Sequence, residues 1–122
     1  MVKAPLYPLR FEPILKRTIW GGNKILSLKN LELNAESIGE SWELSGVQDN
    51  VSVVSDGYLK GMSLNDIIIK YKEIFLGETV YQRYGNQFPL LLKFIDASQD
   101  LSIQVHPDDE VARKHRQSNG KT

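Results

Sequence analysis

Residues 101–107 read Leu-Ser-Ile-Gln-Val-His-Pro, and this short stretch shows the clearest pattern in the chain. Side chains alternate across a β-strand, so one face of a strand here would be apolar. The other face would carry a row of hydroxyl, amide and imidazole groups from Ser102, Gln104 and His106. Pro107 has no backbone N–H and biases the residue before it toward extended backbone, which places His106 at the exit of the strand.

The spacing of Gln104 and His106 would let both side chains bind one metal ion. Imidazole nitrogen suits zinc, and an amide oxygen is an unusual but possible neutral partner. The same alternation also fits an antiparallel strand whose polar face meets only water. The pattern by itself leaves both interpretations open.

The preceding segment, 90–96, reads Leu-Leu-Leu-Lys-Phe-Ile-Asp and predicts a second strand. Lys93 interrupts an otherwise apolar run, so it either extends to the surface or supplies positive charge to a pocket. If residues 97–100 form a hairpin, Lys93 lies near the polar face of the next strand. Lys93, Ser102, Gln104 and His106 would then form one patch suited to a metal ion and an anionic, oxygen-rich ligand.

The remaining elements alternate between short strands and short helices. Strands are expected within 7–20, at 39–45 and at 51–55, and the Gly pair after Trp20 should break the chain. Helices are expected after Asn23 as N-cap, at 64–71 behind the near capping box of Ser63 and Asp66, and at 78–84. A charged helix at 108–116 places its acids and bases as the helix dipole favours, so its residues, His115 included, need no further role.

Composition narrows the class of protein. The chain has 122 residues, with 15 basic and 15 acidic side chains and no cysteine. That balance argues against a nucleic-acid groove or a polybasic membrane surface, and no apolar run approaches the roughly 20 residues that span a bilayer. Disulfides and thiolate metal sites are excluded. We therefore expect one globular domain, soluble and cytoplasmic. The strands and short helices expected along the chain put its fold class as mainly β with helices.

Several motifs together resemble the type I phosphomannose isomerase (mannose-6-phosphate isomerase) family. The most specific are 88–97, Phe-Pro-Leu-Leu-Leu-Lys-Phe-Ile-Asp-Ala, and 101–109, which continues through Gln-Val-His-Pro to Asp-Asp. Trp-Gly-Gly at 20–22, Gly-Glu-Ser-Trp-Glu-Leu-Ser at 39–45 and Gly-Lys-Thr at 120–122 match further family motifs in the same order. The resemblance covers essentially the whole chain.

The resemblance implies a cupin-type jelly-roll barrel, incomplete in this chain, with a helical insertion at about 63–85. It also implies zinc as cofactor and a hexose 6-phosphate as substrate, with mannose 6-phosphate and fructose 6-phosphate interconverted through an enediol(ate). By motif position, two zinc ligands would be Gln104 and His106. The sugar-phosphate site would be lined by Lys93, Ser102 and Lys121, with Trp20 and Glu40 near the same pocket. The lysine side chains would bind the phosphate dianion through charge-assisted hydrogen bonds.

The family pattern continues Gly-Lys-x-Glu, in which the Glu binds zinc, and a further His ligand comes later. This chain ends at Thr122, one residue before that Glu, and so offers two of four expected ligands. We therefore expect the chain to be the N-terminal portion of such an isomerase. By itself it should bind zinc weakly or not at all, and should not turn over substrate.

Two other functions remain compatible with the sequence. A cupin-like domain with an incomplete metal site could be a non-catalytic module that binds or senses a sugar phosphate. A structural β domain whose polar strand face only meets water is the simplest alternative. A Glu codon directly after Thr122, with a later His, would favour the enzyme over the module. Zinc analysis of Gln104→Ala and His106→Ala variants would separate the enzyme from the structural domain.

Overall fold

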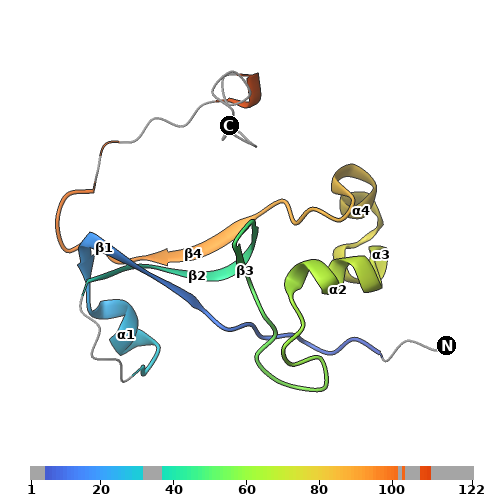
Figure 1. The fold of residues 1–122 in the computed structure, drawn as a ribbon, viewed down its shortest axis with the longest axis horizontal. Coiled ribbons are helices and arrows are strands. Elements are labelled where there is room, and N and C mark those ends of the chain that lie inside the picture. The colour runs from blue at the N-terminus through green and yellow to red at the C-terminus, as the bar shows by residue number, and fades with distance from the viewer. Residues whose placement is uncertain (1–4, 32–36, 102, 104–107, 111–122) are drawn as a thin grey trace.

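The computed structural model describes residues 5–31, 37–101, 103 and 108–110. These residues form an open antiparallel sheet of four strands, with one short helix at one end of the sheet and three at the other (Figure 1). Strand β2 (Ile38–Val47) is the centre of the sheet. It pairs with β1 (Ile14–Gly22) along one edge, with β4 (Leu91–Ile95) along the other, and with β3 (Asn50–Val51) through a tight hairpin.

The register of the sheet places charged and aromatic residues opposite one another. Lys16 of β1 lies opposite Glu40 of β2, and Lys93 of β4 lies opposite Trp42. Directly opposed residues of antiparallel strands direct their side chains to the same face of the sheet. A register shift after Trp42 then leaves Glu43 without a partner in β4. Such an irregularity bends the strand locally and changes the direction in which nearby side chains point.

Helices lie where the local signals predicted them. They are α1 (Lys24–Leu28), α2 (Leu64–Tyr71), α3 (Glu73–Leu76) and α4 (Glu78–Tyr84). At α2 the Ser63 hydroxyl accepts a hydrogen bond from the backbone N–H of Asp66 at 3.1 Å, which confirms Ser63 as the N-cap. Gly85 follows α4 with φ of 62°, a left-handed conformation that glycine adopts without strain. The single turn α3 was not predicted.

Two apolar clusters stabilise the two ends of the molecule. Near α2, the buried residues are Val54, Leu59, Ile67 and Tyr71. Near α1, they are Ile25, Leu26 and Ile38. The sheet between these clusters is covered only in part, and it is here that the charged residues of β1, β2 and β4 meet.

The glycines of two sequence motifs let β1 and β2 approach closely. A Cβ atom built on Gly21 would collide with the Gly39 backbone, and one on Gly39 would lie 2.7 Å from the Trp20 ring. Such distances leave no room for a methyl group. The Gly pair after Trp20 was expected to break the chain, but β1 continues through Gly22 because these residues pair with and pack against β2.

Several predicted strands are shorter than expected. The segment 51–55 is a strand only at Val51, because Val53 and Val54 form single bridges to two different segments rather than one continuous ladder. In segment 7–20 the strand begins only at Ile14. Leu101 and Ile103 have irregular backbone, and the rest of the predicted strand 101–106 lies outside the described residues. Of the predicted helix 108–116, Asp109 and Glu110 are helical and residues 111–116 lie outside.

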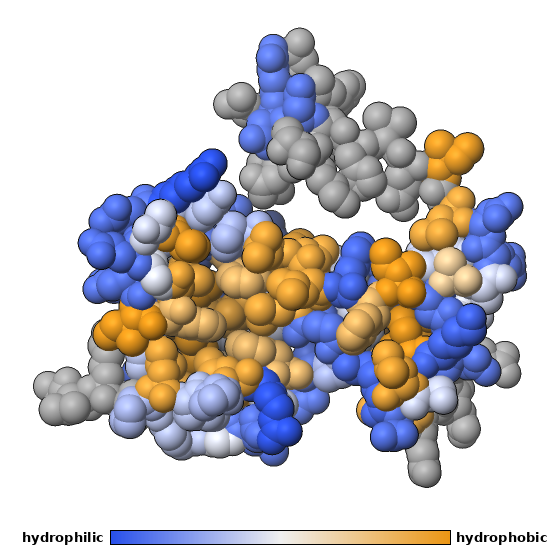
Figure 2. Space-filling model, turned by 180° about the vertical axis from the view of Figure 1, so that it is seen from behind, coloured by the Kyte–Doolittle hydropathy of each residue, from blue (hydrophilic) through white to orange (hydrophobic). Residues whose placement is uncertain are grey.

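Strand β4 remains exposed on both of its faces. Its four apolar residues, Leu91, Leu92, Phe94 and Ile95, are between 36% and 54% exposed. Seen from behind, hydrophobic side chains gather at the centre of the molecular surface (Figure 2). The described strands form an open sheet, and the closed barrel expected from the resemblance remains a proposal. None of the helices in the described part of the chain is long and apolar enough to cross a membrane.

Candidate functional site

The sheet brings Glu40 and Lys93 together, although 53 positions separate them in the sequence. The Lys93 ammonium donates to Glu40 Oε1 at 2.6 Å. The two side chains are 28% and 17% exposed, so the pair lies at the surface but is shielded from much of the solvent. A charge-assisted hydrogen bond of this length fixes both groups. Both residues had been assigned to the sugar-phosphate pocket by resemblance, and the structure places them in direct contact.

Trp42 holds the other oxygen of the same carboxylate. Its indole N–H donates to Glu40 Oε2 at 3.1 Å. The Lys93 Nζ atom lies 5.7 Å from the centroid of the Trp42 ring, and Lys16 Nζ lies 4.7 Å from it, so two cations lie within cation–π distance of one aromatic ring. Lys16 also hydrogen-bonds the side-chain oxygen of Asn50.

Sequence reasoning missed Trp42 and Lys16 as parts of this site. The (i, i+2) spacing of Glu40 and Trp42 on a strand was a usable signal, because such residues share a face. No signal could have found Lys16, since its place opposite Glu40 depends on the register between β1 and β2.

These neighbours keep Glu40 ionised at neutral pH. Burial alone would raise the pKa of the carboxyl group. The hydrogen bonds from Lys93 and Trp42, together with the charges of Lys93 and Lys16, outweigh that effect and lower the pKa below its ordinary value. Glu40 is therefore a stable anion that holds Lys93 in place.

Trp20 lies near the end of β1, where three segments of the chain meet. Its ring packs over Gly39, the residue before Glu40. Its carbonyl oxygen accepts hydrogen bonds from the Ser98 backbone N–H at 2.7 Å and from the Ser98 hydroxyl at 3.0 Å. These hydrogen bonds connect the segment that follows β4 to the end of β1.

Asp96 at the end of β4 has a structural role. It is 6% exposed, and its carboxylate accepts a hydrogen bond from the Lys24 backbone N–H at 2.8 Å, at the start of α1. A Cβ atom on Gly22 would lie 2.8 Å from this carboxylate, so glycine is needed there. Asn23 was expected to cap α1, but its side chain makes no capping hydrogen bond, and Asp96 does so instead.

A second ion pair joins Lys29, the residue after α1, to Glu43 of β2 and has a different geometry. The Lys29 ammonium contacts both oxygens of Glu43, each at 2.8 Å, and lies 5.7 Å from the centroid of the Phe94 ring. The Ser41 hydroxyl donates to the same carboxylate at 2.7 Å. Lys29 is thus held by both oxygens of its partner, whereas Lys93 is held by one.

The predicted zinc ligands Gln104 and His106 lie outside the described residues, as do Ser102 and Lys121. Their roles remain predictions. Within the ranges that the structure describes, no group of three or more His, Asp or Glu side chains is arranged to hold a metal ion.

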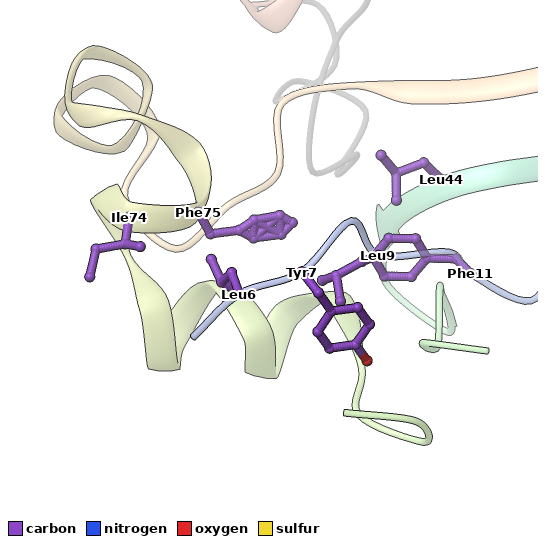
Figure 3. Close-up of a pocket in the computed structure, with 7 residues that line it drawn as sticks. All are labelled: Leu6, Tyr7, Leu9, Phe11, Leu44, Ile74 and Phe75. Carbon is purple, nitrogen blue, oxygen red and sulfur yellow. The ribbon is translucent and has the colours of Figure 1, made fainter. Parts of the chain in front are cut away.

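An apolar pocket of about 360 Å³ lies between the N-terminal segment, β2 and α3. Figure 3 shows the Phe11, Phe75 and Leu44 side chains around one gap, while the Tyr7 hydroxyl points away from it. The pocket is lined by Leu6, Tyr7, Leu9, Phe11, Leu44, Ile74 and Phe75. It offers no charged side chain, so its chemistry does not suit a sugar phosphate.

Comparison with known proteins identifies the family to which the chain belongs. The family model of the type I phosphomannose isomerase catalytic domain matches residues 9–122, so the chain belongs to the type I phosphomannose isomerase family. Among curated relatives, the mannose-6-phosphate isomerase ManA of Bacillus subtilis is 39% identical over 116 residues, which are 94% of this chain and 35% of ManA. The mannose-6-phosphate isomerase of Streptococcus mutans is 36% identical over 115 residues, again 94% and 35%.

The fold is similar to that of a solved relative. The crystal structure of mannose 6-phosphate isomerase from Bacillus subtilis matches with a TM-score of 0.78 at 34% sequence identity. The match covers 93% of this chain and 35% of that structure. The chain therefore spans about a third of the length of the relatives that it matches.

Proposed function

We propose that this chain forms part of the substrate site of a zinc-dependent mannose-6-phosphate isomerase, which interconverts mannose 6-phosphate and fructose 6-phosphate. The observation that carries the proposal is the Lys93–Glu40 pair, held across β4 and β2 at 2.6 Å. Support also comes from the family and from its relatives, which are named as mannose-6-phosphate isomerases.

Lys93 is the residue proposed to meet the substrate. An ammonium group has three N–H donors, and Glu40 engages one of them. The side chain is 28% exposed, so the remaining donors can reach an anionic oxygen of a phosphate or of the developing enediolate. Glu40 stays ionised and fixes the ammonium position rather than supplying a proton.

The proposal extends to residues beyond the described ranges. Gln104 and His106 would hold zinc, which when bound would polarise substrate oxygens. Ser102 and Lys121 would join Lys93 around the sugar phosphate, with Trp20 beside them. We further propose that the open sheet belongs to a cupin-type barrel.

The test replaces the matching segment of Bacillus subtilis ManA with residues 9–122 of this chain and measures isomerisation by a coupled spectrophotometric assay. We expect the exchanged protein to convert fructose 6-phosphate to mannose 6-phosphate. Lys93→Met should lower kcat about 100-fold, the usual loss when one donor to a developing anion is removed. Lys60→Met, at an exposed loop lysine, is the matched control and should leave the rate unchanged.

One result would overturn the proposal. If the exchanged protein folds and binds mannose 6-phosphate without isomerising it, while ManA itself is active, the segment belongs to a non-catalytic sugar-phosphate module.

A further inference from the structure

The two oxygens of Glu40 are held by two different donors. Lys93 donates to Oε1 at 2.6 Å, and the Trp42 indole N–H donates to Oε2 at 3.1 Å. The Lys29–Glu43 pair shows the alternative, because there one ammonium contacts both oxygens at 2.8 Å. The difference bears on how many Lys93 donors remain for a ligand.

A lysine that contacts both oxygens of a carboxylate uses more of its donors and has more of its charge neutralised there. At Glu40 the second oxygen, Oε2, accepts a hydrogen bond from the Trp42 indole N–H instead. Lys93 then makes one short hydrogen bond and keeps two N–H groups for another acceptor. The register supports this arrangement, since Trp42 lies directly opposite Lys93 and two residues from Glu40 on the same strand.

We propose that Trp42 is a positioning residue, whose indole N–H holds one oxygen of Glu40 and thereby leaves the Lys93 ammonium able to bind an anionic oxygen of a sugar phosphate. The identity of this ligand rests on the proposed function, whereas the hydrogen bond from Trp42 does not. The positioning role needs the N–H donor as well as the ring. Phenylalanine would keep an aromatic ring near Lys16 and Lys93 but could not donate to Glu40.

The first experiment observes the indole N–H resonances of the 122-residue chain by ¹H–¹⁵N NMR. The chain contains two tryptophans, so Trp20 is an internal control. Glu40→Gln should shift the Trp42 indole resonance because it removes the charged acceptor, and should leave the Trp20 indole resonance in place. An unmoved Trp42 resonance would overturn the proposal. This readout involves no sugar, so it is independent of the proposed function.

The second experiment titrates wild type and Trp42→Phe with mannose 6-phosphate. We expect binding to weaken about fivefold to tenfold in the variant, in keeping with the loss of one hydrogen bond to a charged group. The amide spectrum of the variant reports whether it folds. The Glu43 carboxyl resonance should not move, since the donors of Glu43 are intact.

A double-mutant cycle then asks whether Trp42 acts through Glu40. Because the indole is proposed to work only on this carboxylate, Trp42→Phe should have no further effect on binding in a Glu40→Gln background. An equal loss in both backgrounds would overturn the proposal and indicate that the ring acts by packing alone. If wild type fails to bind mannose 6-phosphate but the Trp42 resonance still responds to Glu40→Gln, the hydrogen bond is supported and the proposed function fails.

Discussion

The buried Asp96 carboxylate offers the sharpest test of how the site is held together, through the Asp96→Ala substitution. Asp96 caps α1 through the Lys24 N–H at 2.8 Å, while its backbone N–H donates to the Gly39 carbonyl oxygen, also at 2.8 Å. One residue thus ties the end of β4 to the start of α1 and to β2. The alanine variant keeps the backbone contact and loses the cap.

The expected loss of stability follows from the hydrogen bond that the Lys24 N–H can no longer make. Removing a helix N-cap costs about 0.5–2 kcal/mol, and we place this one at the upper end because the Asp96 carboxylate is buried. We therefore expect Asp96→Ala to lower the free energy of unfolding by about 2 kcal/mol. With an m-value of roughly 1–3 kcal/mol/M, the urea midpoint should fall by about 1 M. Asp96→Asn keeps an oxygen acceptor and should lose about half as much.

The assay is urea unfolding followed by circular dichroism, with the exposed Asp100→Ala as control. That control should stay within about 0.5 kcal/mol of wild type. If Asp96→Ala unfolds at the same urea concentration as Asp100→Ala, the carboxylate does not cap α1 and the reasoning is refuted.

Two further predictions concern the sheet and a third concerns the proposed zinc site. Gly39→Ala should destabilise the fold by about 2 kcal/mol in urea unfolding, because its methyl group would lie 2.7 Å from the Trp20 ring. The pKa of Glu40 is lowered in the folded state, so its contribution to stability is present above the unfolded pKa and is lost as the pH falls through the folded pKa. Replacing Glu40 with Gln should remove that acid-dependent loss, at most about 1 kcal/mol since Lys93 and Glu40 are partly exposed. In the ManA segment exchange, His106→Ala should lower the zinc content measured by elemental analysis.

Local signals predicted the helices well, because helix ends depend on nearby residues. Ser63 caps α2 as its spacing to Asp66 indicated. The cap of α1 could not be predicted in the same way, since Asp96 lies 72 positions from Lys24 and reaches it only through the pairing of β4 with β2. Asn23 occupies the predicted N-cap position before α1, but its side chain makes no capping hydrogen bond.

The residues of the candidate site also differ in whether the sequence could predict them. Resemblance to the family named Glu40 and Lys93, and the structure adds that they touch. Trp42 and Lys16 join them through strand register, which a single sequence does not specify. Pairing between distant strands therefore decides which charged groups meet.

The central claim, that Lys93 binds the phosphorylated substrate, is tested most directly by titrating the 122-residue chain with mannose 6-phosphate and with mannose. Amide NMR should show saturable shifts for residues of β2 and β4 around Lys93 with the phosphate ester, and none with mannose. Lys93→Met should weaken this binding about tenfold or more, and Lys60→Met should not. Equal binding by wild type and Lys93→Met, with both folded, would contradict the account.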